Sequence, residues 1–200
     1  MTTWLHRQRL EAVLAAVRAA GARTVLDLGC GEGALLSLMA HEPAIRHIVG
    51  IDVSAAALET LRARLGSVPA EIVRKIEIVH GSITETGRSF SGFDAALLVE
   101  TIEHIDPDRL SEVEGAVFGH MRPKAVMITT PNRSYNWLLG VPPTRFRHAD
   151  HRFEWGRAKF RAWAGGVARR NGYEASFEDV AGAHPDYGGA SQMGIFRRAE

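Results

Sequence analysis

The sequence contains only one cysteine, Cys30, and no long run of apolar residues. A single cysteine excludes a disulfide framework and any zinc site built from several cysteines, and it fits a reducing compartment. No apolar stretch approaches the roughly 18 residues of a membrane-spanning helix, and the N-terminus lacks the apolar segment of a signal peptide. We therefore expect a soluble protein of the cytoplasm.

The chain also lacks an excess of charge of either sign. Its 200 residues include 24 Lys+Arg and 23 Asp+Glu, which gives a formal net charge of +1 with histidine neutral. This balance argues against a polycation that binds nucleic acid through bulk charge. Because 46% of the residues are hydrophobic and no stretch is repetitive or linker-like, we predict a single domain over residues 1–200.

The balanced total hides an uneven distribution of charge along the chain. Residues 1–120 hold 11 basic and 16 acidic residues, whereas residues 122–170 hold 11 basic residues and only two acidic ones, Asp150 and Glu154. Two interpretations remain open at this point. The basic segment is either a solvated surface in an arginine-rich sequence or a binding site for a polyanion.

Short β-branched and apolar segments alternate with amphipathic segments along the chain. Strands are predicted at 24–28, 47–53, 76–80, 93–99 and 125–130, and helices at 4–20, 35–40, 55–65, 110–118 and 160–171. This alternation predicts an α/β fold with a doubly wound, mostly parallel sheet. Two late segments, 175–180 and 193–197, predict a closing antiparallel hairpin, and residues 131–150 have little periodicity.

A glycine-rich loop follows the first predicted strand. Residues 27–33 read Asp-Leu-Gly-Cys-Gly-Glu-Gly, and a predicted helix begins directly after them. Glycines permit a sharp turn and the close approach of a ligand, and the helix N-terminus offers free N–H groups. Asp52 ends the second strand, where a carboxylate accepts the two hydroxyls of a ribose. These features predict a nucleoside-containing cofactor at this edge of the sheet.

The cofactor half of the chain, about residues 20–130, resembles the class I S-adenosylmethionine-dependent methyltransferases, whose glycine loop has this D-L-G-C-G-E-G form. The resemblance implies a Rossmann-like fold that binds S-adenosylmethionine, with the methionine end at the loop and the adenine near residues 81–83. The implied cofactor-binding residues are Asp27, Gly29, Gly31, Gly33, Asp52, Ser54 and Ser82. The alternatives are a nicotinamide-binding unit, which usually has a longer G-x-G-x-x-G spacing, and an inactive domain that kept the turn.

Two carboxylates and an imidazole follow the fourth predicted strand, as Glu100, Glu103 and His104. Offsets of three and four residues place them on one face if the chain turns helically there. Carboxylates brought close together repel unless a proton or a cation lies between them, and oxygen ligands with imidazole suit Mg²⁺ or Mn²⁺. The alternative is that Glu100 merely caps the next helix.

A dense run of charged and aromatic residues occupies positions 147–157. It contains His148 and His151, and a second histidine would complete a set of two glutamates and two histidines with room for two vicinal hydroxyls. Arginine and tryptophan side by side suit phosphate contact and base stacking at a single-stranded end. A histidine in a loop is otherwise an ordinary surface residue.

The combination of these motifs resembles one family closely, the RNA 3′-terminal ribose 2′-O-methyltransferases, which include the enzymes that modify small RNAs and bacterial RNA-repair relatives. The matching segments are E-T-I-E-H at 100–104, T-T-P-N at 129–132 and D-H-R-F-E-W-G-R at 150–157. The resemblance implies metal ligation by Glu100, Glu103, His104 and His151. His148 would contact the ligands or the substrate, or would replace His151 as the fourth ligand. Gly156 departs from the family, which usually has a threonine there to cap the next helix.

The resemblance also implies a function for the whole chain. The cofactor's methyl group would pass to the 2′-hydroxyl of the 3′-terminal ribose of RNA with help from Mn²⁺ or Mg²⁺, in RNA end protection or repair beside a polynucleotide kinase–phosphatase and ligase. The elements for metal and RNA are then residues 100–104 and 131–165. The predicted RNA contacts are Arg133, Trp137, Arg145, Arg147, Arg152, Trp155 and Arg157. The alternatives are a small-molecule O-methyltransferase and a non-catalytic module that binds RNA 3′ ends.

Overall fold

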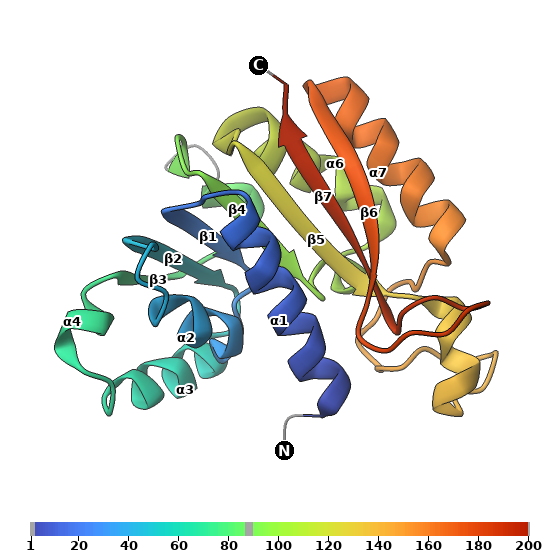
Figure 1. Cartoon of the computed structure of the whole chain (residues 1–200), viewed down its shortest axis with the longest axis horizontal. Coiled ribbons are helices and arrows are strands. Elements are labelled where there is room, and N and C mark those ends of the chain that lie inside the picture. Colours follow the sequence, from blue (N-terminus) through green and yellow to red (C-terminus); the bar gives the residue numbers. More distant parts are fainter. Residues whose placement is uncertain (1–2, 87–89, 200) are drawn as a thin grey trace.

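A seven-stranded sheet forms the centre of the molecule, in a computed structural model that describes residues 3–86 and 90–199 (Figure 1). The strand order is β3-β2-β1-β4-β5-β7-β6. Strands β1 to β5 pair in parallel, and β7 runs antiparallel to both β5 and β6. The strands are β1 (Thr24–Leu28), β2 (His47–Asp52), β3 (Ile76–His80), β4 (Ala95–Val99), β5 (Ala125–Pro131), β6 (Tyr173–Val180) and β7 (Ser191–Arg198).

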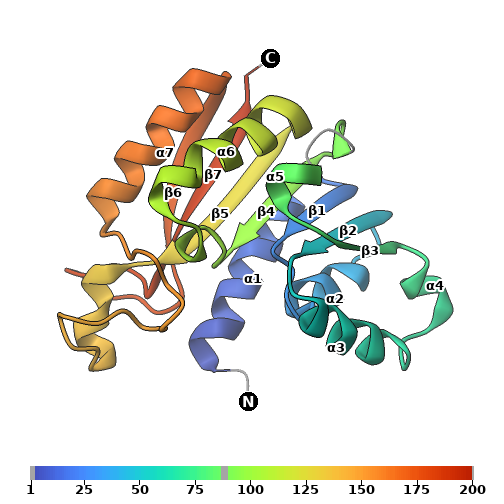
Figure 2. The ribbon, with the colours of Figure 1, turned by 180° about the vertical axis from the view of Figure 1, so that it is seen from behind.

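Helices cover both faces of this sheet and bury two apolar clusters (Figures 1 and 2). Cluster one packs against α1 (Trp4–Ala19), α2 (Ala34–Ala40) and α3 (Ala55–Leu65). Cluster two packs against α6 (Leu110–Glu114), the π-helical η4 (Gly115–Met121) and α7 (Arg157–Asn171). Helices on both faces explain why the parallel strands are apolar along almost their whole length. Among the described residues, no helix is long and apolar enough to cross a membrane.

The predicted doubly wound sheet with a closing hairpin is confirmed. Ser54 caps α3 by accepting a hydrogen bond from the Ala57 N–H, and α7 ends at Gly172 in a left-handed conformation, as the sequence indicates. Gly156 stands at the N-cap of α7 and provides no side-chain hydrogen bond there.

Some predicted boundaries are wrong. The helix expected at 110–118 ends after five residues and continues as the π-helical η4, in a segment whose two glycines lower its α-helix propensity. The short helices α4 (Ala70–Val73), α5 (Ile83–Thr86) and the 3₁₀ helix η3 (Pro107–Arg109) were not expected, and neither was the 3₁₀ helix η5 (Arg133–Leu139), which lies within the segment of little periodicity. Such one- or two-turn helices are too short to produce a periodic pattern.

Asp94 connects the start of β4 to two neighbouring strands. Its carboxylate accepts hydrogen bonds from the N–H groups of Arg23 and Thr24 at 2.9 and 3.1 Å and from Lys124 Nζ at 2.8 Å. Burial favours the neutral acid, but these donors outweigh it and lower the pKa of Asp94 to about 2. The stabilisation is therefore present above the ordinary carboxyl pKa and is lost as the pH falls toward 2.

We expect Asp94→Asn to lower the free energy of unfolding at neutral pH by roughly 1–3 kcal/mol, because two backbone donors lose a charged acceptor. The variant should also lose less stability than the wild type between about pH 4 and about pH 2. Urea denaturation across this range measures both effects. The exposed Asp108→Asn is the control, and equal pH profiles for the two variants would contradict the assignment.

Candidate active site

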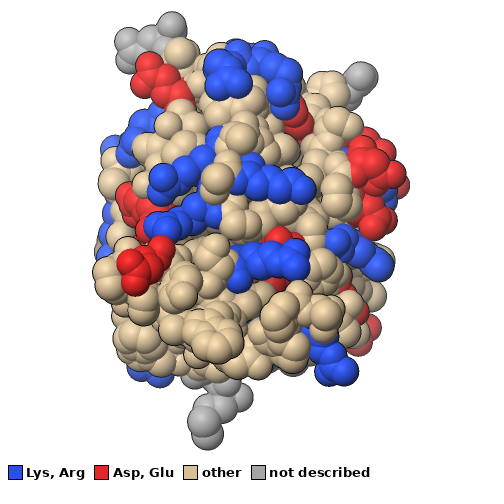
Figure 3. Space-filling model, turned by 90° about the vertical axis from the view of Figure 1, so that its right-hand side faces the viewer, with Lys and Arg blue, Asp and Glu red and all other residues tan. Residues whose placement is uncertain are grey.

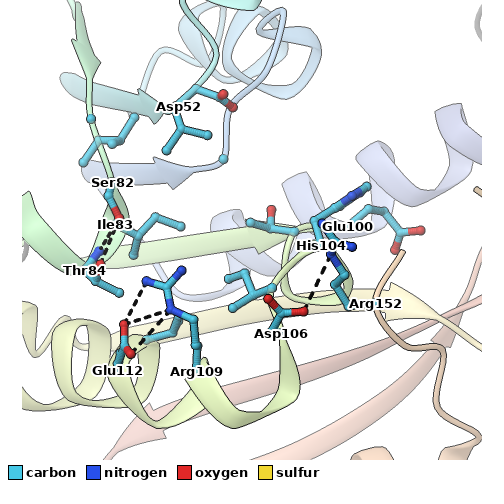
Figure 4. Close-up of a pocket in the computed structure, with 17 residues that line it drawn as sticks. Asp52, Ser82, Ile83, Thr84, Glu100, His104, Asp106, Arg109, Glu112 and Arg152 are labelled. Carbon is cyan, nitrogen blue, oxygen red and sulfur yellow. Dashed lines mark hydrogen bonds and ion pairs between the residues drawn. The ribbon is translucent and has the colours of Figure 1, made fainter. Parts of the chain in front are cut away.

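A cavity of about 540 Å³ opens at the carboxyl ends of the parallel strands (Figure 4). Ligands of open α/β sheets bind at this edge. Two groups of predicted residues share its wall: Gly29, Asp52 and Ser82 from the predicted cofactor site, and Glu100 and His104 from the acid–histidine motif. A bound cofactor in this cavity therefore lies next to the acid–histidine motif.

The glycine loop is held by the end of β2. The Gly29 N–H donates to the Ile51 carbonyl at 2.8 Å, and the Gly31 N–H donates to Asp52 Oδ2 at 2.7 Å. Gly29 has a φ of +82°, and a Cβ at this position would lie 2.6 Å from the Thr101 methyl group. The position therefore requires glycine, because it combines a left-handed backbone with close contact to the turn after β4.

The other predicted cofactor residues lie beneath the loop, on the cavity wall or at helix N-caps. Asp27 is buried beneath the loop; burial raises its pKa to about 7, and the Asp52 carboxylate adds to the rise. Ser82 contacts Thr84 Oγ1 at 2.9 Å on the cavity wall. Gly33 and Ser54 stand at the N-caps of α2 and α3 and do not line the cavity.

Three of the predicted metal ligands converge in the structure. One donor atom from each of Glu103, His104 and His151 lies within 4.8 Å of the other two. Glu103 and His104 belong to the 3₁₀ helix η2 (Ile102–His104), whereas His151 comes from the loop before α7. The loop is tied to η2, because the Arg152 N–H donates to the Glu103 carbonyl at 2.7 Å.

The environment of Glu103 is unusual for a carboxylate. Its side chain is fully buried; Oε2 accepts a hydrogen bond from Thr130 Oγ1 at 2.9 Å, and Oε1 is buried without a hydrogen-bond partner. Burial raises the pKa of Glu103 well above its ordinary value, and Glu100 raises it further. Burial also lowers the pKa of His104, as do His151 and His148. An oxygen without a partner beside two imidazoles fits a cation-binding group.

Glu100 is not one of the residues whose donor atoms converge with those of Glu103, His104 and His151. Its φ of +51° places it outside the helical turn that the sequence suggested, so the three motif residues do not share one helix face. Its Oε2 lies 3.2 Å from Arg9 Nη1 of α1 and accepts a hydrogen bond from Ser191 Oγ of β7 at 3.2 Å. Its Oε1 accepts one from Thr129 Oγ1 at 3.1 Å. The Glu100 carboxylate is thus held from three sides at the edge of the cavity.

His151 is oriented by a buried carboxylate, Glu154, which was not among the predicted site residues. Its Nδ1 lies 2.6 Å from Glu154 Oε1. The other oxygen of Glu154 accepts a hydrogen bond from Asn136 Nδ2 at 2.5 Å, and Oε1 also accepts one from the Arg147 N–H at 2.7 Å. A histidine that donates through Nδ1 presents the lone pair of Nε2 to a metal.

Two predicted RNA contacts are engaged inside the protein. Trp155 is only 7% exposed and stacks on Phe153 with a centroid distance of 4.1 Å, so its expected role in base stacking is corrected to a role in packing. Arg147 donates hydrogen bonds to Asn136 Oδ1 and to the carbonyls of Asn132 and Ala190.

The other predicted RNA contacts lie at the surface or close to it. Trp137 is 74% exposed, and the exposed Arg133 and Arg145 lie near it. Arg152 is exposed at the mouth of the cavity, where its Nε lies 3.7 Å from Asp106 Oδ1. Arg157 is half-buried and lies 3.5 Å from Asp179. His148 is exposed, with its ring centroid 6.1 Å from that of His104 and 5.7 Å from that of His151.

Sequence reasoning missed several residues of the cavity and its supports. Arg9 and Ser191 lie 91 positions from Glu100 on either side, so no local pattern connects them. Arg109 and Glu112, which pair across one turn and line the cavity, stand at a spacing of three that is common on solvated helix faces (Figure 4). Glu154 had a visible signal, because it is one of only two acids in the basic segment.

Comparison with known proteins agrees with this geometry. The profile of the family described as "Methyltransferase domain" matches residues 25–124. A protein of Rattus norvegicus named small RNA 2′-O-methyltransferase is 36% identical over 97% of this chain and 51% of its own length, and one of Arabidopsis thaliana with the same name is 33% identical over 97% of this chain and 22% of its own. The chain thus spans about half the length of the rat protein, and less of the plant one.

A solved structure is similar to this chain over the whole of a methyltransferase domain. The crystal structure of the methyltransferase domain of bacterial CtHen1-C superposes with a TM-score of 0.88 at 38% identity, covering 98% of this chain and 100% of that chain. Both the fold and the sequence of a whole methyltransferase domain are therefore matched. The chain belongs to the methyltransferase-domain family and, within it, to the Hen1 methyltransferase domains, and it has their S-adenosylmethionine-dependent methyltransferase fold.

Proposed function

We propose that this chain transfers the methyl group of S-adenosylmethionine to the 2′-hydroxyl of the 3′-terminal ribose of RNA, in RNA end protection or repair. The observation that carries the proposal is the shared cavity, where Glu100 and His104 stand beside the cofactor residues Gly29 and Asp52. Holding a methyl donor and a hydroxyl acceptor next to each other removes much of the entropic cost of the reaction. The names of the relatives support RNA as the acceptor.

The acid–histidine group fits a divalent cation such as Mn²⁺ or Mg²⁺. Glu103, His104 and His151 would hold the ion, because they offer one buried oxygen without a hydrogen-bond partner and two imidazoles. Glu100 would join them on release from Arg9. Such an ion polarises hydroxyls that bind to it and so favours their deprotonation near neutral pH.

The side chains of the chain itself supply the other parts of the reaction. The exposed imidazole of His148, beside His104 and His151, accepts the proton that the 2′-hydroxyl loses. Asp52 binds the ribose hydroxyls of the cofactor through oxygens that the N–H groups of Gly31 and Ser54 already orient. Exposed arginines of residues 133–157 contact the RNA phosphates, and Arg152 stands at the mouth of the cavity. A polynucleotide kinase–phosphatase and a ligase would then be partners in RNA repair.

Radioactive methyl transfer from S-adenosylmethionine to short RNAs with different 3′ ends tests the proposal. In the presence of Mn²⁺ we expect labelling of an RNA with free 2′- and 3′-hydroxyls and none when the terminal sugar is 2′-deoxy or carries a 3′-phosphate. RNA affinity should also fall steeply as the salt concentration rises, because phosphate contacts release counterions. Labelling that persists without the terminal 2′-hydroxyl refutes the assignment.

A further inference from the structure

A second, smaller cavity lies outside the cofactor site, in the segment that follows β5. It has a volume of about 180 Å³ and shares no lining residue with the first cavity. Its wall consists of Arg133, Asn136 and Trp137 from η5, together with residues 141–143 and Arg145. We call it the arginine–tryptophan pocket. It is smaller than the roughly 300–1,000 Å³ of typical pockets for drug-sized ligands, so it suits one flat group.

The indole of Trp137 is the most exposed large apolar side chain among the described residues, at 74%. Trp155 and Trp163 differ from it, because their rings pack against each other with a centroid distance of 5.6 Å. An indole that remains in water offers a large rigid face at a small entropic cost of binding. This exposure indicates a surface that packs against another molecule.

The charges of the pocket favour an anionic partner. Two of its lining residues are arginines and none is acidic. The Arg133 guanidinium is fixed by a hydrogen bond to the Pro143 carbonyl at 3.2 Å and lies 5.9 Å from the Phe146 ring centroid. The Arg145 guanidinium has neither a hydrogen bond nor an ion pair to any described residue. Figure 3 shows the side of the molecule with α7 and β6, where Lys and Arg side chains gather over the upper and middle parts and the lower part is mostly uncharged.

The backbone of the pocket is already arranged for binding. The Val141 N–H donates to the Asn136 carbonyl at 3.0 Å, and the Arg145 N–H donates to the Pro142 carbonyl at 3.0 Å. Two successive prolines fix the φ angles between these bonds. Little conformational entropy is therefore lost when a ligand binds.

The pocket is also connected to the acid–histidine group. Asn136, which lines it, donates to Glu154 Oε2 at 2.5 Å, and Glu154 Oε1 lies 2.6 Å from His151 Nδ1. Two consecutive contacts thus join a residue of the pocket wall to His151, so the two sites are held in a fixed relation to each other. Among charged partners, a single strand with alternating bases and phosphates matches an indole beside two arginines.

We propose that the arginine–tryptophan pocket binds one nucleotide of the RNA strand upstream of the terminal ribose, with the base stacked on Trp137 and the adjoining phosphate on Arg145. This inference rests on the proposed function, since it takes RNA as the substrate. It adds a second point of attachment that lets the strand length influence recognition. Stacking accepts every base, so the site selects for a single strand and not for a sequence.

The test compares Trp137→Ala and Arg145→Ala with two matched controls outside the pocket. Trp4→Ala removes another exposed tryptophan, and Arg46→Ala removes another exposed arginine. Fluorescence anisotropy of a 5′-labelled hexanucleotide measures RNA affinity across a range of salt concentrations. We expect Trp137→Ala to weaken binding about 5- to 100-fold with an unchanged salt slope, and Arg145→Ala to reduce the salt slope by about one.

A second readout separates this inference from the proposed function. Methyl transfer to a nucleoside 5′-monophosphate, which is too short to reach both sites, should be unaffected by Trp137→Ala, whereas the KM for the hexanucleotide should rise. If RNA is methylated but neither variant changes hexanucleotide affinity, the pocket does not bind RNA, and its indole serves a protein partner instead. An equal loss in the Trp4→Ala control also overturns the inference. If the wild type binds RNA through Trp137 but does not methylate it, the proposed methyl-transfer function is refuted, whereas RNA binding by the pocket is supported.

Discussion

Replacing Glu103 by glutamine is expected to reduce methyl transfer by about a thousandfold while leaving S-adenosylmethionine affinity nearly unchanged. The carboxylate belongs to the acid–histidine group and lies outside the cofactor cavity lining, so its loss acts on the acceptor side of the reaction. Metal-assisted polarisation contributes several kcal/mol to a transition state, and about 1.4 kcal/mol corresponds to a factor of ten in rate. Single-turnover transfer and calorimetric cofactor binding measure the two quantities.

The same substitution should change stability in a way that distinguishes a ligand from a structural residue. Without a cation, Glu103 buries an oxygen that has no partner, so the neutral amide of the variant should be at least as stable as the wild type. With Mn²⁺, only the wild type should gain thermal stability. Glu112→Gln, an exposed carboxylate of the cavity wall, is the control. Parallel losses of cofactor affinity and activity in Glu103→Gln would instead indicate a structural role.

Replacing Glu154 by alanine is expected to weaken Mn²⁺ affinity about 10- to 100-fold, although Glu154 does not belong to the group of donor atoms. The substitution removes the acceptor that orients His151 and leaves Asn136 and the Arg147 N–H without their partner. Burial lowers the pKa of the Arg147 guanidinium, and the charge of Glu154 acts against this effect. Electron paramagnetic resonance of free Mn²⁺ measures the affinity.

The stability of the Glu154→Ala variant should fall as well, by about 1–3 kcal/mol in the free energy of unfolding, because the Asn136 amide and the Arg147 N–H lose their buried acceptor. Glu154→Gln separates the two effects: it keeps the volume and one acceptor oxygen, so it should recover most of the stability while retaining a measurable loss of Mn²⁺ affinity. Urea denaturation in the absence of metal measures the free energy of unfolding of each variant. Unchanged Mn²⁺ affinity in both variants would show that His151 needs no orienting carboxylate.

Local sequence patterns predicted the parts of the site that lie on one continuous segment. The glycine loop and Asp52 depend on residues only a few positions apart or on the regular spacing of β-α-β units, and both lie at the expected edge of the sheet, whereas Ser54 caps α3 and does not line the cavity. The E-x-x-E-H motif predicted that Glu100, Glu103 and His104 lie together; Glu103 and His104 converge with His151, whereas Glu100 lies outside that group.

Long-range contacts set the features that the sequence did not reveal. Nothing near Glu100 indicates that its backbone becomes left-handed or that Arg9 binds its carboxylate. The sequence also gave no means to tell that Trp137 is exposed and Trp155 buried. Each tryptophan has an arginine three or four positions before it, Arg133 and Arg152 respectively. Trp137 is 74% exposed and Trp155 only 7%, because residue 155 pairs with Asn132, directly after β5, and with Gln192 of β7, both distant in sequence.

The contacts of Glu100 have a consequence for the order in which the site assembles during folding. Its side chain takes its position from α1 near one end of the chain and from β7 near the other, each 91 residues away. Contacts between such distant residues form late, because the entropy of closing long loops must be overcome first. The backbone hydrogen bonds of the glycine loop join it to the end of β2, which is much closer in sequence, so they can form earlier. A folding intermediate with β7 still undocked therefore has a formed cofactor loop but a misplaced Glu100.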